Sequence, residues 1–253
     1  MDVPRQLAYR RIRKGCVVGY SPVLALVTGI YEVAIAVWAL RGTGERRVLR
    51  VTALILALLG TYQFLEVLIC ANPAAAGFLP RLAFITVTWL PPLGLVLIAR
   101  LSRPQLRTFH VSATCMLAAG AGMVLWILAD QSFATASVCS AVYARYAHVA
   151  PRFMIYGVFY WLGLFGMVAL SGYGILRSED AHQKQLLQQV FYGTVGFVLP
   201  SVVISHFAPA TRGALPSIMC HFALILALFL TRLVLLERRD EEEPQHTPIA
   251  QPH

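Results

Sequence analysis

Among the ionisable side chains inside the long apolar runs of this sequence, four matter most, and any chemistry must be argued from them first. They are Glu32, Glu66, His206 and His221. An ionisable group in hydrocarbon costs several kcal/mol unless it is paired or hydrated, so each is a candidate for function. If the apolar runs cross a bilayer in alternating directions, Glu66, His206 and His221 lie at similar depth beneath one face. We therefore expect these three side chains to share a site.

Polar residues near these groups extend the predicted site. Side chains three or four residues apart on a helix share a face, so a tyrosine and a glutamine accompany Glu66, and a serine lies one turn before His221. The sequence predicts an outward-facing polar pocket with these candidates: Tyr62, Gln63, Glu66, Asp130, His206, Ser217 and His221. Glu32 lies nearer the middle of its run, where we expect it to pair with a tyrosine or a backbone group.

Three kinds of function fit such a pocket. The leading hypothesis is the binding or sensing of a small, partly apolar amphiphile. An alternative is an intramembrane enzyme, of hydrolase or cyclase type, that uses Glu66 as acid or base beside His206 and His221. A third is a structural subunit of a membrane complex, in which the same side chains hydrogen-bond across helices and hold the bundle together. The aromatic cluster at 156–161 fits either a pocket lining or an anchor at the membrane interface.

Two histidines and a carboxylate are also the ligand set of catalytic zinc. Helical zinc sites often carry paired histidines such as HExxH or HxxxH, and neither pattern occurs in this sequence. We therefore expect no cofactor, with zinc as the less favoured alternative.

The sequence holds five cysteines, and all except Cys115 lie at or near the same predicted face: Cys16, Cys70, Cys139 and Cys220. Cys70 ends the second apolar run, and Cys139 lies in the long loop after the fourth. An oxidising exterior permits disulfides, so we predict a Cys70–Cys139 bond that ties down this loop. No CxxC motif occurs, and disulfide exchange has no motif support.

The elements that position these residues must be membrane helices. Of 253 residues, 58% are apolar and 13% are charged, whereas soluble domains carry about 25% charged residues. A helix needs about 20 apolar residues to cross a bilayer. We predict an all-α polytopic membrane protein, a bundle of seven transmembrane helices, in which Pro91 and Pro92 interrupt the third helix. The expected spans are 16–40, 51–71, 82–101, 108–129, 153–176, 190–207 and 214–236.

The net charge of +9 comes from basic residues that flank the apolar runs. This pattern is typical of contact with lipid head groups. No stripe of basic and aromatic residues follows the chain, so we expect a lipid bilayer rather than a nucleic acid as partner. Both lysines, Lys14 and Lys184, lie outside the spans. A retinal pigment, which needs a lysine inside a helix, is therefore excluded.

Three regions outside the spans have distinct compositions. Residues 1–15 form a basic leader, and residues 237–253 form an acidic, proline-rich tail that we expect to be disordered. The segment 178–189 is polar, and we expect the sixth helix to begin there in water with Ser178 as its N-cap. The segment 131–152 is apolar enough that a re-entrant or additional span stays open.

The distribution of basic residues predicts the orientation. With seven spans, the face that holds the C-terminus carries about twelve basic residues, whereas the loops of the other face carry about four. The positive-inside rule then places the C-terminus in the cytoplasm of a multi-pass protein of the cell membrane. The five basic residues of the leader oppose this orientation.

Short matches connect the chain with known membrane proteins. YQFLEVLICAN at 62–72, TWLPPLGLVLIARL at 88–101, VCS at 138–140 and LPSVV…LPSIMCHFALIL at 199–226 resemble an uncharacterised family of bacterial seven-helix membrane proteins. The resemblance implies the fold and a pairing among Cys16, Cys70 and Cys139, and it carries no activity. Ceramidase-type hydrolases are similar in helix number, but His221 lacks their paired histidine. Integral membrane terpene cyclases share an acid at the position of Glu66, but 214–236 lacks their second acid.

Overall fold

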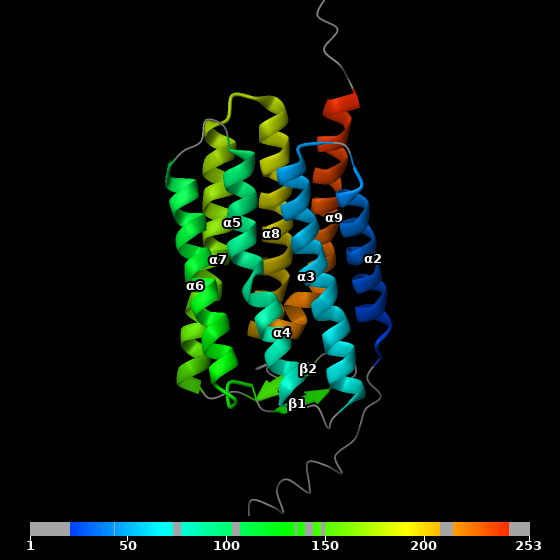
Figure 1. The fold of residues 1–253 in the computed structure, drawn as a ribbon, viewed down its shortest axis with the longest axis vertical. Coiled ribbons are helices and arrows are strands. Elements are labelled where there is room, and N and C mark those ends of the chain that lie inside the picture. Colours follow the sequence, from blue (N-terminus) through cyan, green and yellow to red (C-terminus); the bar gives the residue numbers. More distant parts are fainter. Residues whose placement is uncertain are drawn as a thin grey trace, which may run out of the picture.

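The computed structural model describes residues 21–42, 44–72, 77–102, 107–134, 136–139, 144–147, 150–207 and 215–242. Eight helices run along the bundle, with these bounds: α2 (Val23–Leu40), α3 (Arg46–Ala71), α4 (Phe78–Thr88), α5 (Leu90–Leu101), α6 (Arg107–Ala129), α7 (Ala150–Arg177), α8 (Ala181–Phe207) and α9 (Leu215–Glu242) (Figure 1). Because α4 and α5 together make one span, the described part of the chain has seven helices long and apolar enough to cross a membrane. The predicted seven-helix membrane bundle is confirmed.

The third span is broken where the sequence predicts it. Helix α4 ends at Thr88 and α5 begins at Leu90, with Pro91 and Pro92 in its first turn. Proline is tolerated there because the first N–H groups of a helix have no partner within it. A side chain at Gly163 would collide with Pro91, so α7 approaches this break closely.

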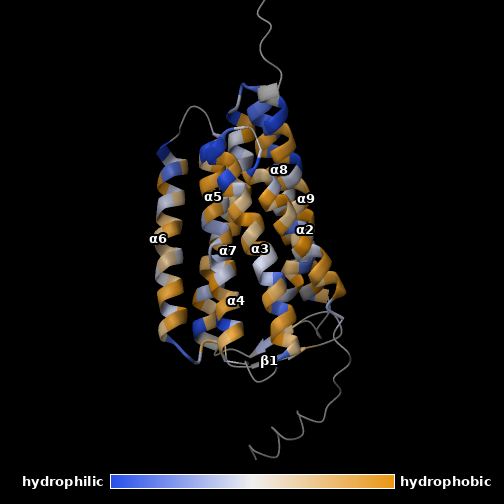
Figure 2. Cartoon of the chain, turned by 45° about the vertical axis from the view of Figure 1, so that its right-hand side comes forward, coloured by the Kyte–Doolittle hydropathy of each residue, from blue (hydrophilic) through white to orange (hydrophobic). Residues whose placement is uncertain are grey.

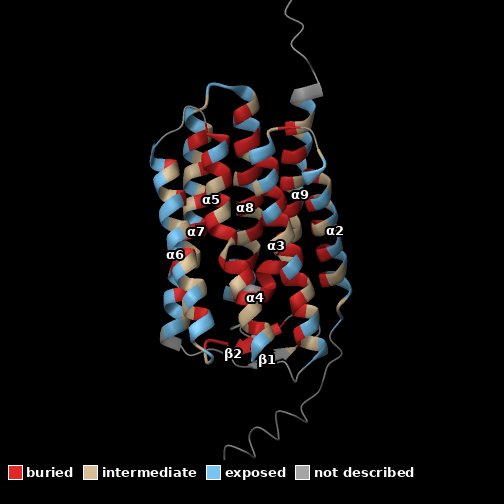
Figure 3. Cartoon of the chain, in the orientation of Figure 1, coloured by how far each residue is buried: buried red, intermediate tan, exposed pale blue. Residues whose placement is uncertain are grey.

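The same span lies at the centre of the bundle. In the third span 72% of the apolar stretch is buried, against 17% in α6. Figure 3 shows the difference, with exposed residues along much of α6 and buried residues along α5. Helix α6 therefore lies at the edge of the bundle, and α4 and α5 form much of the core.

A short β-hairpin occupies part of the segment 131–152. Strand β1 (Ala136–Cys139) pairs antiparallel with β2 (Ala144–Ala147), and Cys139 lies opposite Ala144. The hairpin lies across the end of the bundle where α3 ends and α4 begins (Figure 1). The described part of this segment is thus neither a re-entrant helix nor an additional span.

Two predicted boundaries are wrong. Helix α9 continues to Glu242, so residues 237–242 are helical rather than part of the tail. Helix α8 does begin in the polar segment, but Asp180 caps it instead of Ser178: the Asp180 side chain accepts the His182 N–H at 2.9 Å. The leader 1–15 and residues 243–253 lie outside the described residues.

Hydrophilic residues distinguish one end of the bundle from the other. In Figure 2 they gather where α5 ends and at the C-terminal end of α9, and the middle of the helices is hydrophobic. We call this the basic end, because Arg41, Arg100, Arg177 and Arg239 lie there. The hairpin lies at the opposite end, which we call the hairpin end.

Candidate functional site

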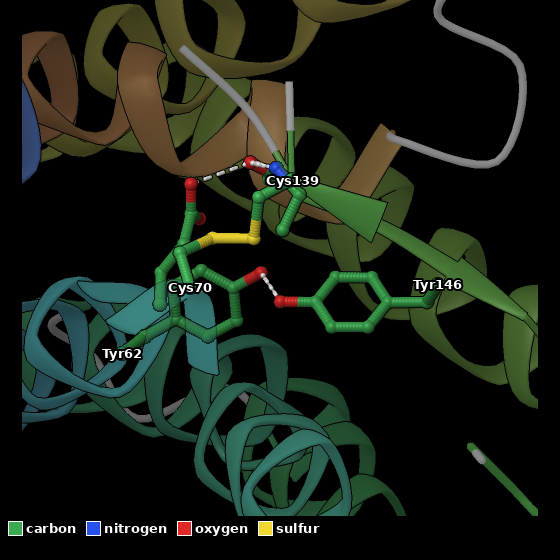
Figure 4. Close-up of a disulfide and its surroundings, with 7 residues drawn as sticks. Tyr62, Cys70, Cys139 and Tyr146 are labelled. Carbon is green, nitrogen blue, oxygen red and sulfur yellow. Dashed lines mark hydrogen bonds between the residues drawn. A yellow bond between two sulfur atoms is a disulfide. The ribbon is translucent and has the colours of Figure 1, made fainter. Parts of the chain in front are cut away.

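A disulfide pins the hairpin to α3. Cys70, in the last turn of α3, is bonded to Cys139 at the end of β1, with the two Cα atoms 5.7 Å apart (Figure 4). The predicted Cys70–Cys139 pairing is confirmed. Cys16, the third cysteine implied by the family resemblance, lies outside the described residues. Cys115 is free and exposed, and Cys220 is free and buried.

Beneath this disulfide, the carboxylate of Glu66 is hydrogen-bonded across helices. Glu66 is fully buried, and its Oε1 accepts a hydrogen bond from the Ser217 hydroxyl of α9 at 2.8 Å. The same hydroxyl accepts the backbone N–H of Ala144 in β2 at 3.1 Å. One serine therefore joins α3, α9 and the hairpin.

Two further polar contacts surround Glu66. The hydroxyls of Tyr62 and Tyr146 lie 3.0 Å apart, so one donates to the other (Figure 4). The side-chain amide of Gln63 donates to the backbone carbonyl of Cys220 at 2.6 Å. Sequence reasoning found four of the residues that meet here. We call them, with the hairpin tyrosine, the Glu66 cluster: Tyr62, Gln63, Glu66, Tyr146 and Ser217.

The two predicted histidines behave differently. His221 is half-buried, and its Nδ1 lies 2.7 Å from the Ser217 carbonyl one turn earlier in α9. It therefore adjoins the Glu66 cluster through Ser217. His206 is exposed near the end of α8, where its ring meets Phe207 edge-on. The structure does not bring His206 to Glu66, and the three residues of the enzyme hypothesis do not form one site.

Asp130 serves the connection after α6 rather than the Glu66 cluster. Its carboxylate accepts hydrogen bonds from the Ser132 N–H and hydroxyl, at 3.0 and 2.7 Å, and pairs with Arg152 of α7. The hydrogen bonds from Ser132, together with the charge of Arg152, hold the pKa of Asp130 below its ordinary 3.8. Within the described ranges, no three His, Cys, Asp or Glu side chains are grouped so that they could hold a metal ion.

A cavity of about 70 Å³ lies beside the Glu66 cluster, between α4, α7, α8 and α9. Its walls are mostly aromatic, and Tyr156, Tyr160, Trp161 and Cys220 are the lining residues whose side chains carry a polar atom. The residues that line it include Phe84, Phe153, Tyr156, Gly157, Tyr160, Trp161 and Cys220. Three of these, Tyr156, Tyr160 and Trp161, belong to the aromatic cluster at 156–161, which was the only sequence signal for the cavity.

The cavity and the Glu66 cluster share structural members. Cys220 lines the cavity with its side chain, and its carbonyl accepts the Gln63 amide. Phe84 lines the cavity, and its ring packs edge-on against Tyr146 with the centroids 5.2 Å apart. Since Tyr146 also bonds Tyr62, the wall of the cavity is in contact with the hairpin.

Glu32 differs from its predicted behaviour. It is fully buried in α2, and within the described residues neither of its carboxylate oxygens has a hydrogen-bond partner. The Thr28 hydroxyl, one turn earlier, has none either. The expected tyrosine or backbone partner is therefore not present there. Glycines bring the helices close at this level, because a Cβ at Gly29 would lie 3.0 Å from the Cβ of Gln63.

Comparison with known proteins does not assign the chain to a family. No protein-family model matches the chain, and no curated protein matches it in sequence.

Proposed function

We propose that this protein binds or senses a small, partly apolar ligand in the aromatic cavity at the hairpin end. The observation that carries the proposal is a preformed cavity with aromatic walls and a few polar groups, the usual character of small-molecule sites. A mostly apolar lining that includes Tyr156, Tyr160 and Cys220 suits a ligand with one polar group. The proposed pocket is therefore the aromatic cavity and not the predicted polar pocket around Glu66. In this proposal the Glu66 cluster supports the cavity rather than lining it.

The size of the cavity limits the ligand. A cavity of about 150 Å³ holds a benzene molecule, so a cavity of about 70 Å³ suits a smaller group, such as a short alcohol or the end of an acyl chain. Phe153, Gly157 and Trp161, one turn apart on α7, are half-buried at its edge. We infer that the ligand enters past this face of α7.

The proposed setting is the cell membrane with the C-terminus in the cytoplasm. Two observations support this orientation. The basic end matches the positive-inside rule, and the disulfide at the hairpin end matches an oxidising exterior. The ligand would then reach the protein from the outer half of the bilayer or from outside the cell.

Filling the cavity tests the proposal. A Cβ at Gly157 would have no heavy atom within 4 Å outside its own helix, so Gly157→Leu places a side chain in the open space without a backbone clash. Gly122 of α6 has the same open surroundings but faces outward, so Gly122→Leu is the matched control. The probes are n-alkanols of increasing length, and the measurement is the thermal unfolding midpoint of the full chain in detergent.

We expect short alkanols to raise the unfolding midpoint of the wild type and of Gly122→Leu, because a ligand that binds only the folded state stabilises it. Gly157→Leu should show no such rise. Equal shifts in all three proteins would mean that the alkanols act on the detergent or the surface. No shift in folded wild type would leave the cavity as a packing gap and favour the structural-subunit hypothesis.

A further inference from the structure

A second hollow lies at the basic end, away from the aromatic cavity. It is a groove of about 420 Å³ between α2 and α9, formed by Tyr31 and by one face of α9. Helices α2 and α9 lie side by side there (Figure 1). The face of α9 that lines the groove includes Leu228, Thr231, Arg232, Leu235 and Arg239.

Two arginines give this groove its charge. Arg232 and Arg239 are seven residues apart, so both lie on the face of α9 that lines the groove. Both are exposed, and no hydrogen bond or ion pair joins either guanidinium to another described residue. No acidic residue lines the groove. Arg232 precedes the acidic run at Asp240 by about 12 Å of helix, so that run does not neutralise it.

The groove, measured from Leu228 to Arg239, is about as long as one lipid leaflet is deep. Leu228 and Arg239 are eleven residues apart, which is about 16 Å along a helix. Half of the hydrocarbon core of a bilayer is about 15 Å. Leu228 and Leu235 line the wall, and Tyr31 and Thr231 are hydrogen-bonded across the floor at 2.8 Å. Arg239 lies at the outer end of the groove, and Arg232 lies about 10 Å deeper along the helix, between Leu228 and Leu235. Long arginine side chains extend toward the headgroups while their stems stay in apolar surroundings, so this combination of charges and leucines is complementary to a phospholipid.

We propose that this groove binds an anionic phospholipid of the leaflet at the basic end. Its phosphate pairs with Arg232 and Arg239, since guanidinium groups bind phosphate through two parallel hydrogen bonds. One acyl chain lies along Leu228 and Leu235. The lipid holds α2 against α9 and does not reach the aromatic cavity, so the site is independent of the ligand proposed above.

Lipid titration of the intact protein tests the groove. The full chain in detergent is titrated with phosphatidylglycerol and with phosphatidylcholine of identical acyl chains, and bound lipid is counted by native mass spectrometry. The test variant is Arg232→Gln/Arg239→Gln. The matched control is Arg47→Gln/Arg107→Gln, which removes the same charge from exposed positions at the same end.

We expect the wild type and the control to prefer phosphatidylglycerol. The test variant should lose about fivefold in affinity for each arginine removed, as expected for basic residues at a lipid surface. An equal loss in the control, or equal binding of both lipids by the wild type, would overturn the proposal. Displacement of the lipid by inorganic phosphate at equal concentration would also overturn it, because the groove would then be a simple anion site. Unchanged circular dichroism shows that the variants are folded.

Discussion

The two fully buried glutamates of this bundle have opposite surroundings. Glu66 lies under the hairpin, where its carboxylate is bonded to Ser217 and, through it, to Ala144. Glu32 lies in the middle of α2, where no described residue bonds its oxygens. Both are 0% exposed, so burial alone does not distinguish them. The difference comes from the hairpin, which delivers an N–H and a tyrosine to the Glu66 cluster from outside the helices.

This contrast separates two uses of a buried acid. At Glu66 the hydrogen bonds offset part of the cost of burial and fix the positions of three elements. At Glu32 that cost is not offset by the described protein groups, and the carboxyl adds nothing to the packing of α2 on α3 that an apolar side chain would not. Stability should therefore depend strongly on the Glu66 cluster and weakly on Glu32 and Thr28.

The largest effect should follow from releasing the hairpin. Cys70→Ser/Cys139→Ser opens a loop with a sequence separation of 69 residues, and we expect a loss of about 2–4 kcal/mol in the free energy of unfolding. Loss of the hairpin would also expose Glu66 and erase its difference from Glu32. Chemical unfolding in detergent measures this, with Cys115→Ser as the control. A variant as stable as the wild type would show that helices alone hold the Glu66 cluster.

A smaller effect should come from the hydroxyl at the centre of the Glu66 cluster. Ser217→Ala removes the donor to Glu66 and the acceptor of the Ala144 N–H, and we expect a loss of about 1–3 kcal/mol, the usual cost of buried unpaired groups. Thr28→Val, which removes a buried hydroxyl with no described partner near Glu32, should not lower the free energy of unfolding, because it leaves no new unpaired group. Equal losses in the two variants would refute the comparison of the two sites.

The smallest effect concerns Asp130, an acid that belongs to neither site. Its pKa is lowered in the folded state, so its contribution to stability is present above the ordinary pKa of 3.8 and is lost as the pH falls through the lowered value. Asp130→Asn should therefore reduce the difference in unfolding midpoint between about pH 6 and about pH 2. Identical pH profiles for variant and wild type would show that the bonds to Ser132 and Arg152 do not persist in solution.

The sequence predicts the number of helices well because each span needs about 20 apolar residues. It predicts helix ends poorly, since hydropathy marks the length in lipid and not the helix itself. Helix α8 includes the polar residues 181–189, and α9 includes 237–242. The hairpin was missed because Ala, Val and Tyr at 136–147 are as apolar as a short span.

The sequence predicted the depth of the site residues along their helices, but not the direction in which their side chains point. Matching positions along α3 and α9 were sufficient to bring Glu66 near Ser217. The rotation of α8 about its own axis decides whether His206 points inward, and the neighbours Ile204, Ser205 and Phe207 do not indicate that rotation. The cavity depends on how the Phe84 and Tyr156 rings pack, which composition does not encode.

The disulfide has a consequence for biogenesis. Cys70 and Cys139 are separated along the chain by two complete spans, Phe78–Leu101 and Arg107–Ala129. Both spans must be inserted, in opposite directions, before Cys139 emerges on the same side of the membrane as Cys70. The bond therefore forms only in chains whose third and fourth spans have both been threaded. A gel-mobility difference between oxidised and reduced protein would therefore show that the third and fourth spans, and with them the first half of the polypeptide, have been inserted.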